Sequence, residues 1–237
     1  MKTTIFTSES RGNADHGWLK SRHTFSFAGY QDRNRMNFGL MRVLNDDIVA
    51  PGKGFGAHPH ENMEIVSIPL KGTLAHKDST GVAKEIKTGD VQIMSAGSGI
   101  THSEYNYSPE EEVHFLQIWI YPKEKDIQPR YEQKSFEKDG FKNSFKTVVS
   151  PQKESDAVWI NQDTWFSMGN FDEGKTAEYS FKKEGNGAFI FLLKGEAEID
   201  ENVLKERDAI GIEDFKNVEM KFLKDSEVLV IDVPMNF

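Results

Sequence analysis

The chain has 237 residues, 37% of them apolar and 28% charged, which suits either two small domains or one large β-rich domain. It contains no cysteine, which excludes a disulfide framework and thiolate chemistry. The formal net charge is −9, and lysines are scattered among acidic residues. Because binding of nucleic acid needs a concentrated basic face, this composition argues against direct DNA or RNA binding.

The first residues, MKTTIFTSESRGNADHGW, lack the long apolar run of a signal peptide. No later stretch has the length and apolarity of a membrane span. We therefore expect a cytoplasmic protein that does not contact the membrane.

The two halves of the chain repeat one pattern of extended segments. In the first half the run MEIVSIPL leads to a turn at Gly72, a polar turn before Asp90 and the run FLQIWIYP. In the second half the run AFIFLL leads to Gly195, Asp208 and VLVIDVP in the same order. Short apolar runs between turn residues, with little helical periodicity, predict strands of β-barrels or β-sandwiches.

This repeat predicts an all-β protein of two tandem jelly-roll barrels packed together. We place the first domain at residues 1–133 and the second at 134–237, with the joint near EKDIQPRYEQKSF. We expect a monomer, because the paired barrels can cover each other's sheet faces.

Histidine is confined to the first half of the chain, so the predicted first domain must hold any histidine-bound metal. The seven histidines are His16, His23, His58, His60, His76, His102 and His114.

The segment GAHPHENME contains the most suggestive pair. Side chains two residues apart point to one face of a strand, so a strand projects His58 and His60 together, with Glu64 on the same side. Pro59 argues against a helix here. Glu64 can be a ligand, a partner that orients a histidine, or a surface residue; the pattern leaves this open.

A second pair, His102 and Glu104, follows another glycine-rich turn in AGSGITHSEYN. Two strands that converge on one ion would offer nitrogen from His58, His60 and His102 and oxygen from Glu104. Four protein ligands leave two positions of an octahedral ion open. This donor set suits Fe(II), which we place first, and also Mn(II), Ni(II), Cu(II) or zinc.

At these residues the chain resembles the cupin superfamily, through Gly52, His58, His60, Glu64 and Gly72, and then Gly89, Gly97 and His102. Within that superfamily it is most similar to the pirin family. The similarity is carried by WLKSRHTFSFAGYQD, by RVLNDDIVAPGKGFGAHPHENMEIVSIPLKGTLAHKDSTG and by GDVQIMSAGSGITHSEYN, and it extends through LQIWIYP and PRYEQ. The second half fits the family's degenerate second cupin domain only loosely.

The resemblance implies a bicupin with one metal site, ligated by His58, His60, His102 and Glu104 and not by Glu64. It also implies a quercetin 2,3-dioxygenase-like enzyme that opens a flavonol with O2 and releases carbon monoxide. Glu104 is the candidate base for the proton of the substrate hydroxyl, since it already lies at the metal.

Other functions fit the same pattern. The first is an iron-binding, redox-sensing or co-regulator protein without dedicated catalysis; a metal-dependent isomerase and a storage role are further alternatives. Apolar residues near the motifs are candidates for the cavity walls, although each is better explained as a residue of the hydrophobic core. They are Phe55, Met63, Phe115 and Trp119. We interpret His23 and His76 as structural, surface or supporting residues. His114 has the strand parity to face the cavity but is better explained as a hydrogen-bonded core histidine.

Overall fold

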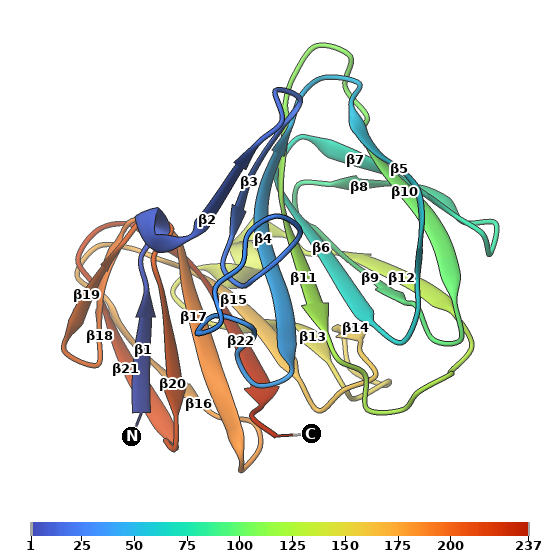
Figure 1. Cartoon of the computed structure of the whole chain (residues 1–237). Helices are drawn as coiled ribbons and strands as arrows, with labels where there is room; N and C mark the ends of the chain where they lie inside the picture. Colours follow the sequence, from blue (N-terminus) through green and yellow to red (C-terminus); the bar gives the residue numbers. More distant parts are fainter. Residues whose placement is uncertain (1, 237) are drawn as a thin grey trace.

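The computed structural model describes residues 2–236 and confirms the predicted all-β class (Figure 1). Within that range the only helices are two 3-10 turns, Ser8–Ser10 and Lys138–Phe141. None of the helices in residues 2–236 has the length and apolarity needed to cross a membrane. The strands form two barrels, each built from one seven-stranded and one four-stranded sheet.

The first barrel contains the histidines. Its large sheet has the order β12 (Arg130–Ser135), β9 (Asp90–Ser95), β6 (Glu64–Lys71), β11 (Val113–Ile120), β4 (Met41–Val49), β3 (Leu19–His23) and β2 (Gly12–Asp15). Its small sheet has the order β5 (Gly54–His60), β10 (Ile100–Asn106), β7 (Thr73–Asp78) and β8 (Ala83–Lys87). All pairings in these two sheets are antiparallel.

The second barrel repeats this plan. Its large sheet has the order β1 (Lys2–Phe6), β20 (Ala209–Glu213), β17 (Asn186–Lys194), β22 (Ser226–Pro234), β15 (Trp165–Phe171), β13 (Lys146–Ser150) and β14 (Val158–Trp159). Its small sheet has the order β16 (Thr176–Ser180), β21 (Asn217–Phe222), β18 (Glu196–Ile199) and β19 (Asn202–Lys205). Strand β9 thus corresponds to β20, β6 to β17, β11 to β22 and β10 to β21.

The turns that suggested the repeat adopt the same conformation in both barrels. Gly72 and Gly195 both have positive φ, +81° and +93°. An aspartate further along each barrel also makes the same contact. The Asp90 carboxylate accepts a hydrogen bond from the Lys87 backbone N–H at 2.7 Å, and the Asp208 carboxylate accepts one from the Lys205 backbone N–H at 3.0 Å. The sequence repeat is therefore a repeat of strand–turn units.

The two barrels are not formed by two consecutive halves of the chain. Strand β1 pairs with β20 and so completes the second barrel, as Figure 1 shows by its blue arrow among orange and red strands. Strand β12, which precedes the second barrel along the chain, completes the edge of the first. The division at 133/134 stays a prediction, but the pairing places residues 2–6 with the second barrel.

Alternating side chains explain why the large sheets pack against each other. On β17, Phe189, Phe191 and Leu193 belong to one apolar cluster, whereas Ala188 and its alternate neighbours belong to another. The first cluster also contains Leu116, Ile118 and Ile120 of β11. Strand residues of alternate parity face opposite sides, so this cluster is the core between the two barrels.

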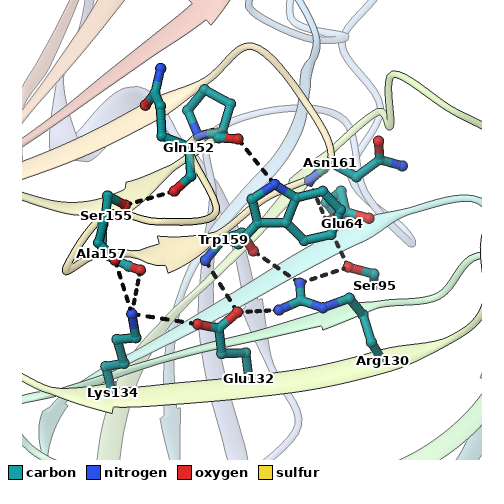
Figure 2. A network of polar contacts seen from close by, with 11 residues as sticks. Glu64, Ser95, Arg130, Glu132, Lys134, Gln152, Ser155, Ala157, Trp159 and Asn161 are labelled. Carbon is teal, nitrogen blue, oxygen red and sulfur yellow. Dashed lines mark hydrogen bonds and ion pairs between the residues drawn. The ribbon is translucent and has the colours of Figure 1, made fainter.

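Polar contacts add to this interface around β12 and β14 (Figure 2). The Arg130 guanidinium lies over the Trp159 ring, 4.6 Å from its centroid, and donates to the Trp159 carbonyl at 2.9 Å. Arg130 also pairs with Glu132, whose carboxylate accepts the Trp159 backbone N–H at 3.3 Å. The barrels are therefore held together by apolar packing and by a directional polar network.

Candidate metal centre

Three of the predicted ligands meet between strands β5 and β10 of the small sheet. His58 and His102 are direct partners in the antiparallel register, and His60 follows His58 on the same strand face. The ring centroids lie 4.5 Å apart for His58 and His102, 4.8 Å for His58 and His60, and 4.9 Å for His60 and His102. One ring nitrogen from each lies within 4.8 Å of the other two. The i, i+2 argument thus correctly predicted their common direction.

The fourth predicted residue, Glu104, lies beside this group but has other partners. A register shift on β10 separates it from His102. Its carboxylate accepts hydrogen bonds from Gln117 Nε2 at 2.7 Å and Ser67 Oγ at 3.1 Å. Among the described residues it clusters with His102 and His76 rather than with His58 and His60. The four-residue ligand set remains a prediction.

The histidines fit a divalent cation chemically. Burial lowers the pKa of His60 to about 4 and that of His102 to about 3, and the neighbouring imidazoles add to both shifts. Both rings are therefore neutral near pH 7, as metal ligation requires. Neither nitrogen of the buried His102 has a hydrogen-bond partner within residues 2–236. Since a buried imidazole without partners is costly, an ion is a physically suitable partner.

His58 is held in place from its other side. Its Nδ1 lies 2.7 Å from the Gly56 carbonyl oxygen, so Nδ1 carries the proton and Nε2 is free to act as a ligand. A backbone carbonyl on the second ring nitrogen is the usual support for a metal-ligating histidine.

A cavity of about 240 Å³ opens in front of the three histidines. Its lining combines apolar walls with polar residues from the large sheet. The lining residues are Leu19, Ser21, His23, Phe27, Asn45, Asp47, Phe55, His58, His60, His102, Glu104, Gln117 and Trp119. Phe55 and Trp119 therefore face the cavity, whereas Phe115 is buried in an apolar cluster and Met63 packs against another.

Asp47 is the most unusual group of this lining. It is 3% exposed, and burial, together with the nearby Asp46 and Glu104 carboxylates, raises its pKa to about 7. Its Oδ1 has no hydrogen-bond partner in the part of the chain that the structure describes. The cavity therefore contains a carboxyl group that can donate or accept a proton near neutral pH.

Glu64, which the sequence left open, lies at the barrel interface (Figure 2). Its carboxylate accepts hydrogen bonds from Ser95 Oγ at 2.8 Å and from the Asn161 backbone N–H at 3.2 Å. Residue 161 belongs to the segment between β14 and β15. The side chain therefore joins the histidine-containing barrel to the second barrel.

Of the remaining histidines, His114 pairs with Asp46 at 2.5 Å and His76 with Asp78 at 2.9 Å, which agrees with supporting roles. His23 lines the cavity, which the sequence interpretation missed. It also missed Asp47, Ser67 and Gln117. Each of these three is a polar residue within an otherwise apolar strand and lies on the inward face of that strand. The segments are VLNDDIV, IVSIPL and LQIWI. A polar residue at an inward position is the signal that could have identified them.

Two barrels of this plan, with histidines gathered in the first, define a bicupin protein with a candidate metal centre. The chain belongs to the pirin family. Residues 5–120 match the family model named Pirin, and residues 147–233 match the model of the quercetinase C-terminal cupin domain.

Individual proteins of this family are similar to the chain over most of its length. The chain is 40% identical over 227 residues to the quercetin 2,3-dioxygenase of Escherichia coli K12, covering 96% of each protein. It is 40% identical over 222 residues to a pirin-like protein of Caulobacter vibrioides, covering 93% of this chain and 95% of the other. The crystal structure of the E. coli bacterial pirin YhhW in complex with nickel(II) superposes with a TM-score of 0.93 at 38% identity, covering 98% and 99% of the chains. These similarities support a metal-binding site in this chain.

Proposed function

We propose that this protein is a metal-dependent dioxygenase that opens a flavonol such as quercetin and releases carbon monoxide. The convergence of three imidazoles on a cavity with aromatic walls carries the proposal. It is supported by the relatives named quercetin 2,3-dioxygenase.

His58, His60, His102 and Glu104 would hold one divalent ion, with Fe(II) as our first choice and Mn, Ni, Cu or Zn compatible with the same donors. When bound, such an ion acts as a Lewis acid that lowers the pKa of a coordinated hydroxyl group. Glu104 would accept the proton that this hydroxyl releases. Gln117 and Ser67 hold its carboxylate in one orientation, so it need not reorganise to do so.

The cavity walls would orient the substrate. Phe27, Phe55 and Trp119 offer faces and edges for an aromatic ring, and Asp47 offers a hydrogen bond to a ring hydroxyl. At about 240 Å³ the cavity lies below the roughly 300–1,000 Å³ of sites that enclose a drug-sized ligand. We therefore expect it to seat the ring that reaches the metal while the rest of the flavonol extends outward.

The test is carbon monoxide release from quercetin after anaerobic loading with Fe(II) and admission of O2. We expect the native protein to release carbon monoxide. In His60→Ala the rate of release should fall at least about a hundredfold, because losing even a residue that only supports a metal ligand can cost that much activity. His114→Ala is the matched control, since His114 pairs with Asp46 and does not line the cavity among the described residues. Equal release from native protein, His60→Ala and free iron would refute the proposal. Retained iron without release would favour the iron-binding sensor.

A further inference from the structure

A patch of polar side chains lies on the cavity wall formed by the neighbouring strands β3 and β4 of the large sheet (Figure 1). On β3 these residues are Ser21 and His23, and their register partners on β4 are Asp47 and Asn45. All four line the cavity, and each is at most 4% exposed. Buried positions on a strand are usually apolar, so this group of polar residues needs an explanation.

Three of the four side chains have a buried polar atom that lacks a hydrogen-bond partner within residues 2–236. These atoms are Asn45 Oδ1, Asp47 Oδ1 and His23 Nδ1. An unpaired polar atom in a protein interior is costly, and it indicates a partner outside the chain. Because the amide oxygen of Asn45 can only accept a hydrogen bond, the group that complements it is a donor such as a hydroxyl.

A second buried asparagine of the first barrel shows the contacts of a structural amide. Asn106 is also 4% exposed. Its Nδ2 donates to the Val49 carbonyl at 3.0 Å and to the Glu111 carbonyl at 2.7 Å, and its Oδ1 accepts the Ser108 backbone N–H at 3.0 Å. The Asn45 oxygen makes no comparable contact with any described residue. The fold therefore uses the amide of Asn106 and leaves the oxygen of Asn45 to a ligand.

Asn45 lies one strand away from the side chains that hold Glu104. Its register partner on β11 is Gln117, whose Nε2 donates to the Glu104 carboxylate at 2.7 Å. Neighbouring strands of a sheet are about 4.8 Å apart. An aromatic ring that presents one hydroxyl to the three histidines can therefore present a second hydroxyl to Asn45.

We infer that Asn45, assisted by His23, determines substrate specificity by binding a hydroxyl group that the substrate carries in addition to the one at the metal. A site that hydrogen-bonds a substrate hydroxyl rejects the analogue without it, because the polar groups of the site are then left unpaired. The cavity thus selects polyhydroxylated aromatic compounds over those with a single hydroxyl. This inference rests on the proposed function, since it specifies the substrate class of the same cavity.

Binding of two flavonols in the absence of O2 tests this selection without turnover. Quercetin carries further ring hydroxyls, whereas 3-hydroxyflavone has only the hydroxyl proposed to meet the metal. Calorimetry on the Ni(II)-loaded native protein should show at least about tenfold tighter binding of quercetin. Asn45→Leu should reduce this preference at least about threefold by weakening quercetin binding, and His23→Phe should act in the same direction. Asn106→Leu is the matched control and should keep the preference.

The possible results separate this inference from the proposed function. An unchanged preference in Asn45→Leu, or in His23→Phe where Asn45→Leu does not fold, would overturn the specificity role while leaving flavonol binding intact. Equal affinity of the native protein for both flavonols would do the same. Failure of the native protein to bind either flavonol would overturn both the specificity role and the proposed function.

A stability measurement on the ligand-free protein distinguishes recognition from a structural role. Asn45→Leu removes an amide oxygen that has no partner among the described residues, so the midpoint of urea unfolding should stay equal or rise. Asn106→Leu removes an amide with three hydrogen bonds, so its midpoint should fall. A fall in Asn45→Leu as large as that in Asn106→Leu would make Asn45 a structural residue and overturn the inference.

Discussion

The two barrels share one strand plan, yet the histidine-lined cavity lies in the first, whereas apolar side chains fill the interior of the second. In the second barrel, inward residues of β17, β20, β21 and β22 form a continuous apolar cluster, in which the Phe171 and Phe222 rings stack at 4.1 Å. In the first barrel two smaller apolar clusters occupy separate regions. Buried polar residues such as Ser67, Gln117 and Glu104 are additional inward groups there. The difference shows that inward side chains, rather than strand order, decide whether a barrel interior is apolar or presents polar groups to a cavity.

The largest effect is expected from opening the filled barrel. Phe222→Ala removes a fully buried ring and leaves a cavity, which should lower the free energy of unfolding by about 3–5 kcal/mol. Metal affinity should stay unchanged, because the ring lies in the other barrel. Urea unfolding and calorimetric metal titration would measure the two quantities. A loss of metal affinity in a folded variant would contradict the separation of the barrels.

The next effect concerns a strand whose inward residues differ between the barrels. Strand β10 places Glu104 inward where β21 places apolar residues such as Met220. Glu104→Gln preserves the shape but removes the proposed proton acceptor, so we expect turnover of quercetin to fall about a hundredfold or more. Steady-state kinetics with Fe(II)-loaded protein would measure this. Unchanged turnover would eliminate the proposed role of Glu104.

A smaller effect is expected where the barrels meet. Glu64→Ala removes the acceptor for Ser95 Oγ and for the Asn161 N–H, and should cost about 1–3 kcal/mol of unfolding free energy. Its metal affinity should equal that of the native protein if Glu64 only joins the barrels. Metal titration of the folded variant decides this, and a loss of affinity would instead make Glu64 part of the centre.

The last prediction concerns the pH dependence of stability. The pKa of His102 is about 3 in the folded protein and near 6.5 in the unfolded chain, so between these values the unfolded state binds more protons. The free energy of unfolding of the metal-free protein therefore decreases as pH falls from about 6.5 toward 3. His102→Phe should lose less on acidification than the native protein. The midpoints of urea unfolding at pH 7 and pH 4.5 would be measured for the native protein and for His102→Phe. An equal decrease of the midpoint in both proteins would contradict the lowered pKa of His102.

Much of the fold follows from local pattern. The turns at Gly72 and Gly195, the matching Asp90 and Asp208 and the flanking apolar runs predicted two barrels, because each is a short-range preference of the backbone. The common direction of His58 and His60 followed from strand periodicity in the same way. The exchange of edge strands, in which β1 joins the second barrel, could not be predicted, because pairing of distant segments leaves no local signal.

The sequence by itself determined the all-β class, the repeat and the location of a histidine centre in the first barrel. Tertiary structure decided which polar residues share that centre: it placed His76 beside His102 and Glu104, and it turned Glu64 toward Asn161 of the other barrel. Periodicity gives the side of a strand on which a residue lies. The neighbours across a barrel depend on how separate sheets pack, which is a property of the whole chain.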